Sequence, residues 1–191
     1  LPIWWYVCGE PDKALSLADQ LVDRNPGTPT SYSVRSALLI DLRRYTEAIQ
    51  AARKSLQLAP GREWPHQLIG DSLILMNRPN EAKAEFRSVS PDDLYRLRSE
   101  GVMAARSGDT NSVEHIVSQI QKVSGDSAMF QYAQVYAQAR QVDRAFEALE
   151  KGLVVKDPGV TGVRTDPFLD PIRRYPRYPA FVKKVNFPAC S

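Results

Sequence analysis

The sequence predicts an all-α fold built as a stack of antiparallel helix pairs. Three alanines, Ala14, Ala48 and Ala82, follow one another at intervals of 34 residues, and Pro26 and Pro60 keep the same interval. Helical periodicity covers most of the chain, and no convincing strand pattern precedes residue 159. A period of this length is typical of stacked two-helix units. We therefore expect a right-handed superhelix of about four full hairpins, one partial N-terminal hairpin and a C-terminal capping segment.

Proline and capping residues mark the expected helices. Pro11, Pro79 and Pro91 each precede helix-forming residues, where a missing N–H costs nothing. Ser90 and Asp109 are the expected N-caps of two helices. The short connections between helices make neighbours antiparallel. The expected helices span residues 11–24, 29–42, 45–58, 63–76, 79–89, 92–107, 110–123, 127–139 and 142–155.

Small residues recur where the two helices of a hairpin should cross closely. In the middle of the first helix of each full hairpin these residues are Ser36, Gly70, Gly101 and Ala133. Near the start of the second helix they are Ala14, Ala48, Ala82 and Ala145, and Val113 departs from the pattern. Small side chains let two backbones approach to ridge-into-groove distance. A larger side chain at such a crossing is expected to cost about 1–3 kcal/mol.

The two ends of the chain differ from the repeats. Leu1 falls midway along a first helix, so we expect upstream residues to complete that hairpin and the aromatic cluster Trp4 to Tyr6 to pack at the end of the core. Residues 1–158 form the expected repeat array, and residues 159–191 form the expected capping segment on the last hairpin. Its apolar residues, spaced to cover that hairpin, are Phe168, Leu169, Ile172, Phe181 and Val182.

Together these positions resemble a tetratricopeptide repeat array over residues 9–158. The resemblance also rests on large apolar residues before the turns, such as Leu39, Leu73 and Tyr136, and implies a superhelix that binds other proteins. The segments Asp157-Pro158-Gly159-Val160 and Asp166-Pro167-Phe168-Leu169 are similar to the closing segment of arrays in bacterial signalling proteins. Such arrays occur in membrane-linked winged-helix regulators, adenylate cyclases and Ser/Thr kinases. This second resemblance implies a sensory or docking region with an effector domain upstream.

Composition narrows the possible functions. With 43% hydrophobic and 25% charged residues among 191, the chain is typical of globular proteins, and no apolar run approaches the roughly 18–20 residues that span a bilayer. The net charge is +3, and residues 161–191 carry six Lys or Arg against two Asp or Glu. This basic tail is interpreted as a solvated face, with a nucleic-acid contact as the alternative.

Neither metal nor cofactor chemistry is expected. Cys8 and Cys190 lie near opposite ends of the sequence, and neither His66 nor His115 has a metal-ligand spacing to a cysteine. The sequence holds no G-x-G-x-x-G, phosphate loop, G-x-S-x-G or H-E-x-x-H motif. We therefore expect a protein that is not an enzyme.

Partner contacts are expected from first-helix residues that packing does not use, because first helices line the concave groove of such arrays. Aromatic, amide and guanidinium groups in this set suit an extended or helical peptide. Arg98 and Arg106 lie two turns apart and could clamp an acidic group or pair with acids on neighbouring helices. The candidate groove residues are Asp41, Trp64, Gln67, Asp71, Tyr95, Arg98, Arg106, Phe130, Gln134 and Gln138.

Some tetratricopeptide proteins hold a peptide C-terminal carboxylate with lysine and asparagine on these helices. The corresponding faces here carry Ser33, Ala37, Gln67 and Asp71, so that chemistry is not expected.

Three functions remain open from the sequence. The first is a non-catalytic interaction module that binds a peptide or helix of a protein partner in the concave groove. The alternative is a sensory, ligand-binding domain of a bacterial signal-transduction or transcription-regulating protein. The third is weak nucleic-acid association through the basic tail. If either of the first two functions is correct, no nucleic-acid partner is expected. A cytoplasmic location is favoured, or a periplasmic one if a membrane span precedes the chain.

Overall fold

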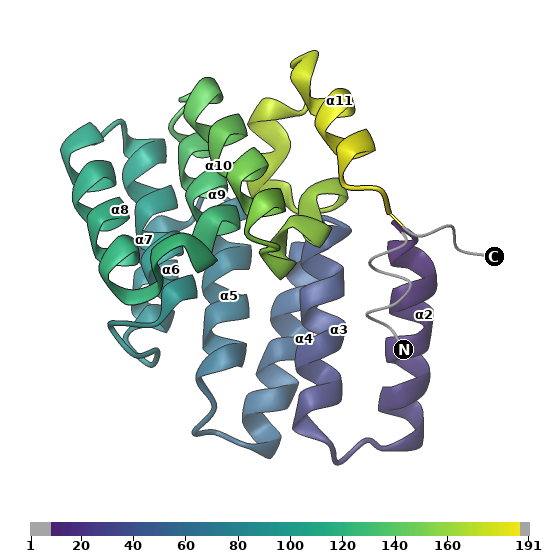
Figure 1. The fold of residues 1–191 in the computed structure, drawn as a ribbon. Coiled ribbons are helices and arrows are strands. Elements are labelled where there is room, and N and C mark those ends of the chain that lie inside the picture. Colours follow the sequence, from purple (N-terminus) through teal and green to yellow (C-terminus); the bar gives the residue numbers. More distant parts are fainter. Residues whose placement is uncertain (1–8, 188–191) are drawn as a thin grey trace. The chain divides into compact units, whose positions relative to one another are not determined.

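The computed structural model describes residues 9–187, and every regular element in that range is a helix (Figure 1). The α-helices are α2 (Pro11–Arg24), α3 (Pro29–Asp41), α4 (Tyr45–Leu58), α5 (Glu63–Leu75), α6 (Pro79–Phe86), α7 (Leu94–Ser107), α8 (Thr110–Ser124), α9 (Met129–Gln138), α10 (Val142–Val154) and α11 (Arg177–Lys184). Three 3₁₀-helices are η1 (Gly125–Ala128), η2 (Pro158–Arg164) and η3 (Pro167–Ile172). The all-α prediction is confirmed. The expectations for Trp4 to Tyr6, Cys8 and Cys190 lie outside the described residues.

The described residues form two compact units, 9–90 and 91–187. In the first unit, α3 pairs with α4 and α5 with α6, while α2 packs on α3. In the second unit, α7 pairs with α8 and α9 with α10 (Figure 1). The predicted antiparallel pairs are therefore present in both units. We call α3, α5, α7 and α9 the first helices.

Most predicted helix boundaries agree with the structure, and α2 and α4 agree at both ends. The helix expected to reach residue 89 ends at Phe86, because the N–H groups of Ser88 and Val89 donate to carbonyls three residues back rather than four. The helix expected from residue 127 begins at Met129, because η1 occupies the preceding four residues.

The prediction that Ser90 is the N-cap of α7 is wrong. The cap of α7 is Asp93, whose Oδ1 accepts hydrogen bonds from Tyr95 N at 2.9 Å and Arg96 N at 3.0 Å. Ser90 instead donates its N–H to Glu63 Oε2 at 3.2 Å, so α7 starts two residues later than expected. The other expected cap is confirmed, since Asp109 Oδ1 accepts from Ser112 N at 3.0 Å.

The four small residues at the predicted crossings are all buried. Ser36 donates its hydroxyl to the carbonyl of Ala48 on the paired helix at 2.8 Å. At Gly70, an added Cβ would lie 2.2 Å from the ring of Phe86 on α6. At Gly101 it would lie 2.9 Å from Val135 Cγ2 on α9. Both glycines are therefore required by close packing.

Every full hairpin turns through one left-handed residue. Arg43, Asn77 and Arg140 each have φ of 59°, and Gly108 has φ of 78°. The residue after each of these donates its N–H to a carbonyl five residues back, which is the Schellman end of a helix. These bonds run from Arg44 to Leu39, Arg78 to Leu73, Asp109 to Ala104 and Gln141 to Tyr136. The turn conformation thus repeats with the same period as the small residues.

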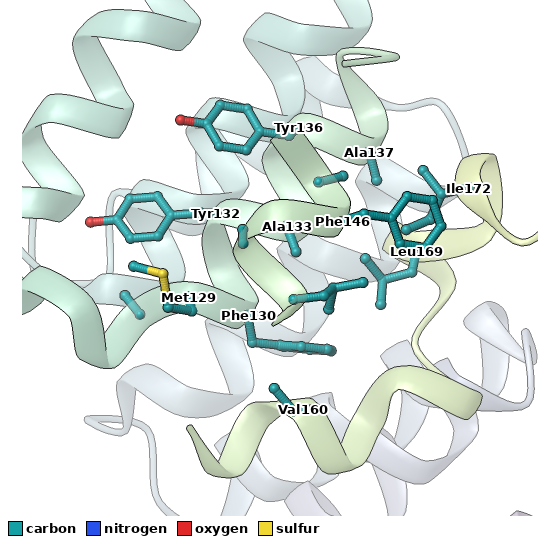
Figure 2. Packing of buried hydrophobic residues seen from close by; sticks show 14 of the residues in the cluster. Met129, Phe130, Tyr132, Ala133, Tyr136, Ala137, Phe146, Val160, Leu169 and Ile172 are labelled. Carbon is teal, nitrogen blue, oxygen red and sulfur yellow. The ribbon is translucent and has the colours of Figure 1, made fainter. Parts of the chain in front are cut away.

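The second unit has a core shared between the last hairpin and the residues that follow it. Phe146 of α10 is fully buried and belongs to one cluster with Leu169 and Ile172 of η3 (Figure 2). Phe181 of α11 joins the same cluster. On the side of α9 toward α8, the Tyr132 hydroxyl donates to Gln121 Oε1 at 2.9 Å, and burial raises its pKa to about 12.

Candidate functional site

The first-helix surface of α9 holds a later part of the same chain. Gln134 and Gln138 lie one turn apart on this helix and face the C-terminal segment, residues 157–187. Gln134 Nε2 donates to Asp166 Oδ2 at 2.6 Å, and Gln138 Nε2 donates to the carbonyl of Phe168 at 2.7 Å. Two residues that the sequence assigned to a partner therefore bind an internal 3₁₀ segment.

Phe130, one turn before Gln134, also contacts the C-terminal segment. Its N–H donates to Asp157 Oδ2 at 2.8 Å, and the other oxygen of that carboxylate accepts from Gly159 N at 2.8 Å. A Cβ added to Gly159 would lie 2.7 Å from Phe130 Cβ. Figure 2 shows the Phe130 ring beside Val160 of η2, and Phe130 is 5% exposed. The start of the C-terminal segment is therefore fixed to the start of α9.

Arg98 of α7 contacts the same segment. Its guanidinium carbon lies 4.6 Å from the centroid of the Phe168 ring, within cation–π range, and the residue is buried. Arg106, two turns further along α7, is exposed and donates from Nε to Gln138 Oε1 at 2.7 Å. The two arginines considered as a clamp thus have different surroundings, one buried on an aromatic ring and one at the surface.

In the first unit the candidates divide between buried and exposed positions. Gln67 Nε2 donates to Asp71 Oδ1 at 3.0 Å, and both residues are buried on α5. Asp41 ends α3 and is partly buried. Trp64, at the second position of α5, is 40% exposed.

An aromatic residue occupies the second position of three successive first helices. These residues are Trp64 of α5, Tyr95 of α7 and Phe130 of α9. Tyr95 is 52% exposed, so two of the three rings are open to solvent. The third, Phe130, is covered by the chain itself. Trp64 and Tyr95 hold the same place in the repeat, six residues before Gly70 and Gly101, whereas Phe130 lies three residues before Ala133 and thus about one turn further along.

The second unit also contains an open cleft of about 740 Å³ at the turn ends of its helix pairs. Three arginines line it, Arg106 at the end of α7, Arg140 in the turn before α10 and Arg174 after η3, and we call it the arginine cleft. The acidic residue in its lining, Asp170, accepts a hydrogen bond from Arg173 Nε at 2.7 Å. Its chemistry therefore suits a negatively charged ligand.

The basic tail is partly neutralised. Arg173 pairs with Asp170 at 2.7 Å, Arg177 with Asp143 at 3.0 Å and Lys184 with Glu150 at 3.2 Å. These pairs reduce the charge available for a phosphate backbone. Arg144, on the second helix α10, likewise bonds Glu114 and lowers the pKa of that carboxyl.

Sequence reasoning did not identify Arg140, Asp157 or Asp166 as residues of interest for binding, and it considered Arg174 only as part of the basic tail. The two aspartates carry a local signal, because each precedes proline and caps a 3₁₀-helix through the N–H two residues on. The two arginines carry no such signal, since three separate elements bring them together with Arg106.

Within residues 9–187, no helix is long and apolar enough to cross a membrane. The same residues contain no group of three or more His, Cys, Asp or Glu side chains placed to hold a metal ion.

Comparisons with known proteins agree with this architecture. Residues 9–63 match the family model for the tetratricopeptide repeat. A search of curated proteins found no similar sequence. Among solved structures, the chain is similar to a thermophilic tetratricopeptide repeat protein of Thermus thermophilus, with 16% identity, 96% of each chain covered and a TM-score of 0.64.

A second solved structure, the Cut9–Hcn1 hetero-tetramer of the APC/C, has a chain with 14% identity and a TM-score of 0.43. The match covers 94% of this chain and 47% of that one, and it adds no support for the fold. The first likeness extends over nearly the whole length of both chains, and the family model matches the part of the chain that holds α2, α3 and α4. The chain therefore has the fold of a tetratricopeptide repeat protein, and residues 9–63 carry the family's sequence pattern.

Proposed function

We propose that this chain is a non-catalytic interaction module that binds a peptide or helix of a protein partner on the first-helix surface around Trp64. Protein binding is the general role of tetratricopeptide repeats. The observation that carries the proposal is the exposure of Trp64 and Tyr95, which hold the same place in successive repeats, six residues before Gly70 and Gly101. Phe130 packs against a non-repeat segment, whereas Trp64 has 40% of its surface exposed.

The chemistry at the start of α5 suits a protein contact. Tryptophan is among the residues that most often dominate binding energy at interfaces, because it combines a large apolar ring with an N–H donor. Arg62 Nη1 donates to Thr30 Oγ1 at 3.2 Å, which links the starts of α3 and α5. An extended segment that crosses these two helix starts would contact the ring and polar groups together.

Contacts within the second unit support the proposal that a peptide binds on first helices. There, first-helix amides bind the main chain and a carboxylate of a 3₁₀ segment, and an arginine stacks on its aromatic residue. The segment is thus an internal example of a peptide on first helices. Because it covers Phe130 and Gln134, we assign partner binding to the surface in the first unit instead.

The test is selection of peptides from a random display library against the full chain. Selected peptides are then measured against Trp64→Ala and against Leu58→Ala, which removes a similarly exposed apolar side chain from the second helix α4. We expect Trp64→Ala to weaken binding by about thirtyfold, as for a hot-spot residue. Leu58→Ala should leave the affinity unchanged.

Fluorescence gives an independent readout. With Trp4 and Trp5 changed to phenylalanine, Trp64 is the single tryptophan of the chain, and a bound peptide should shift its emission to the blue. The proposal fails if no peptide is selected, or if selected peptides bind Trp64→Ala as tightly as the natural chain.

A further inference from the structure

We propose that the arginine cleft is a second binding site, which takes an acidic segment of a partner protein through its side-chain carboxylates. The site is formed within the second unit by Arg106, Arg140 and Arg174. Trp64 is not among its lining residues, and the cleft differs from the first-helix positions at which lysine and asparagine hold a peptide C-terminus in other arrays.

Charge complementarity is the first argument. Three guanidinium groups line the cleft against one carboxylate, Asp170, which is already paired with Arg173. The planar fork of a guanidinium matches a carboxylate with two parallel hydrogen bonds, and such charge-assisted bonds are the stronger kind. The cleft therefore favours an anion with several carboxylates.

The placement of the arginines favours a peptide segment over a small acid. Arg106, Arg140 and Arg174 come from three different elements around a space of about 740 Å³. A single small carboxylate cannot engage arginines on all sides of a cleft that size, whereas an extended segment can offer one carboxylate to each. The alanines among the lining residues, Ala105, Ala137 and Ala139, leave room for a main chain to approach.

The helix ends limit how deep the anion can lie. α7 and α9 both end at the cleft, and the carbonyl groups of a helix C-terminus carry partial negative charge. A carboxylate is therefore favoured at the rim, where long arginine side chains reach it. Because arginine also stabilises a helix C-terminus, the test must separate binding from stability.

The remaining cations argue against a nucleic acid as the ligand. A phosphate backbone is held by a run of several unneutralised cations. Here Arg173, Arg177 and Lys184 of the same segment are in ion pairs with carboxylates. These ion pairs reduce the positive charge that the segment offers outside the cleft.

The experiment measures fluorescence anisotropy of a labelled peptide, Ala-Glu-Glu-Leu-Glu-Glu-Ala, with the full chain and with two double variants. Arg140→Gln/Arg174→Gln removes two cleft arginines. Arg53→Gln/Arg87→Gln removes the same charge from exposed positions in the first unit. We expect about a tenfold weaker affinity for the cleft variant and no change for the control. Trp64→Ala should also bind the peptide normally, so this test and the test of the proposed function can fail separately.

Denaturant unfolding of both double variants checks that each remains folded at the temperature of the binding assay. Three results would overturn the proposal: equal loss of affinity in the two double variants, equal binding of the glutamine version of the peptide, or no binding to the natural chain. Free citrate that binds as tightly as the peptide would overturn the assignment to a peptide. The assignment to a peptide would also be overturned by a single-stranded oligonucleotide that binds more tightly than the peptide and loses affinity in the cleft variant.

Discussion

At the scale of single residues, glycine positions show how closely the helices of a pair approach. Gly70 faces the ring of Phe86, and a Cβ there would lie 2.2 Å from a ring carbon. Phe86 is 2% exposed and its ring is surrounded by packed atoms, so it cannot move aside without opening a void elsewhere. Gly61, in the connection before α5, has no atom within 4 Å of an added Cβ.

This contrast predicts opposite effects for one chemical change at two sites. Gly70→Ala should lower the free energy of unfolding by about 1–3 kcal/mol, because the methyl group forces the helices apart. Gly61→Ala should be neutral or stabilising by up to about 1 kcal/mol, because alanine restricts the unfolded chain. Urea denaturation of the full chain measures both. Equal effects would show that the contact at Gly70 is not a close crossing.

At the scale of elements, one carboxylate attaches the C-terminal segment to α9. Asp157 accepts N–H groups from Phe130 and from Gly159, both at 2.8 Å, and is 8% exposed. The apolar contacts of Leu169 and Ile172 add to this attachment through the shared core. The segment thus covers the first-helix surface of the last hairpin, and we propose that it is a capping segment of the array.

Removal of the Asp157 carboxylate tests this attachment. Asp157→Ala leaves the buried N–H of Phe130 without its acceptor, so we expect a loss of about 1–3 kcal/mol in the free energy of unfolding. Asp143→Ala is the control, because its carboxylate is highly exposed and makes a surface ion pair worth at most about 1 kcal/mol. Calorimetry of both variants gives the comparison. Similar melting temperatures would mean that the Asp157 bonds contribute no net stability.

The sequence was sufficient for elements that depend on local chemistry. Asp109 was identified as a cap because its type and its place before a helical run coincide. The sequence does not distinguish Asp93 from Ser90 as the cap of α7, because both residue types commonly cap helices. The two differ only in the structure, where Ser90 bonds the distant Glu63 and Asp93 bonds Tyr95 N. The polar contacts of the C-terminal segment were beyond sequence reasoning, since they join residues about 30 positions apart that share no periodic pattern.

The candidate site was predictable in the same limited sense. Repeat register assigns Trp64 and Tyr95 to one place on successive first helices and Phe130 to a place about one turn further along. It could not indicate which ring is covered, because that depends on where residues 157–168 lie. The arginine cleft gave no signal for the same reason.

At the scale of the whole molecule, the chain divides into two compact units, residues 9–90 and 91–187. In repeat arrays, stability is a sum of contributions from each repeat and from its neighbours, so a change in one repeat acts mainly nearby. The close contact at Gly101, where an added Cβ would lie 2.9 Å from Val135, belongs to the second unit.

Amide hydrogen exchange should reveal this locality. Gly101→Leu inserts a side chain against Val135 and Ile116, so we expect the largest loss of protection within residues 91–187. Ser118→Leu is the control, because Ser118 is exposed on α8 and its replacement should leave protection unchanged. Protection lost evenly over residues 9–187 would indicate that the chain opens as one cooperative unit.

The left-handed turn residues also have a consequence for engineering. Three of the four hairpin turns place an arginine or asparagine at a φ of 59°, where glycine is easier to accommodate, and one uses Gly108. The natural chain has therefore not been optimised for thermostability at these bends. To raise the thermostability of the chain, glycine can first be tried in place of Arg43, which belongs to neither surface to which we assign ligands. Arg140 should be kept, because it lines the arginine cleft.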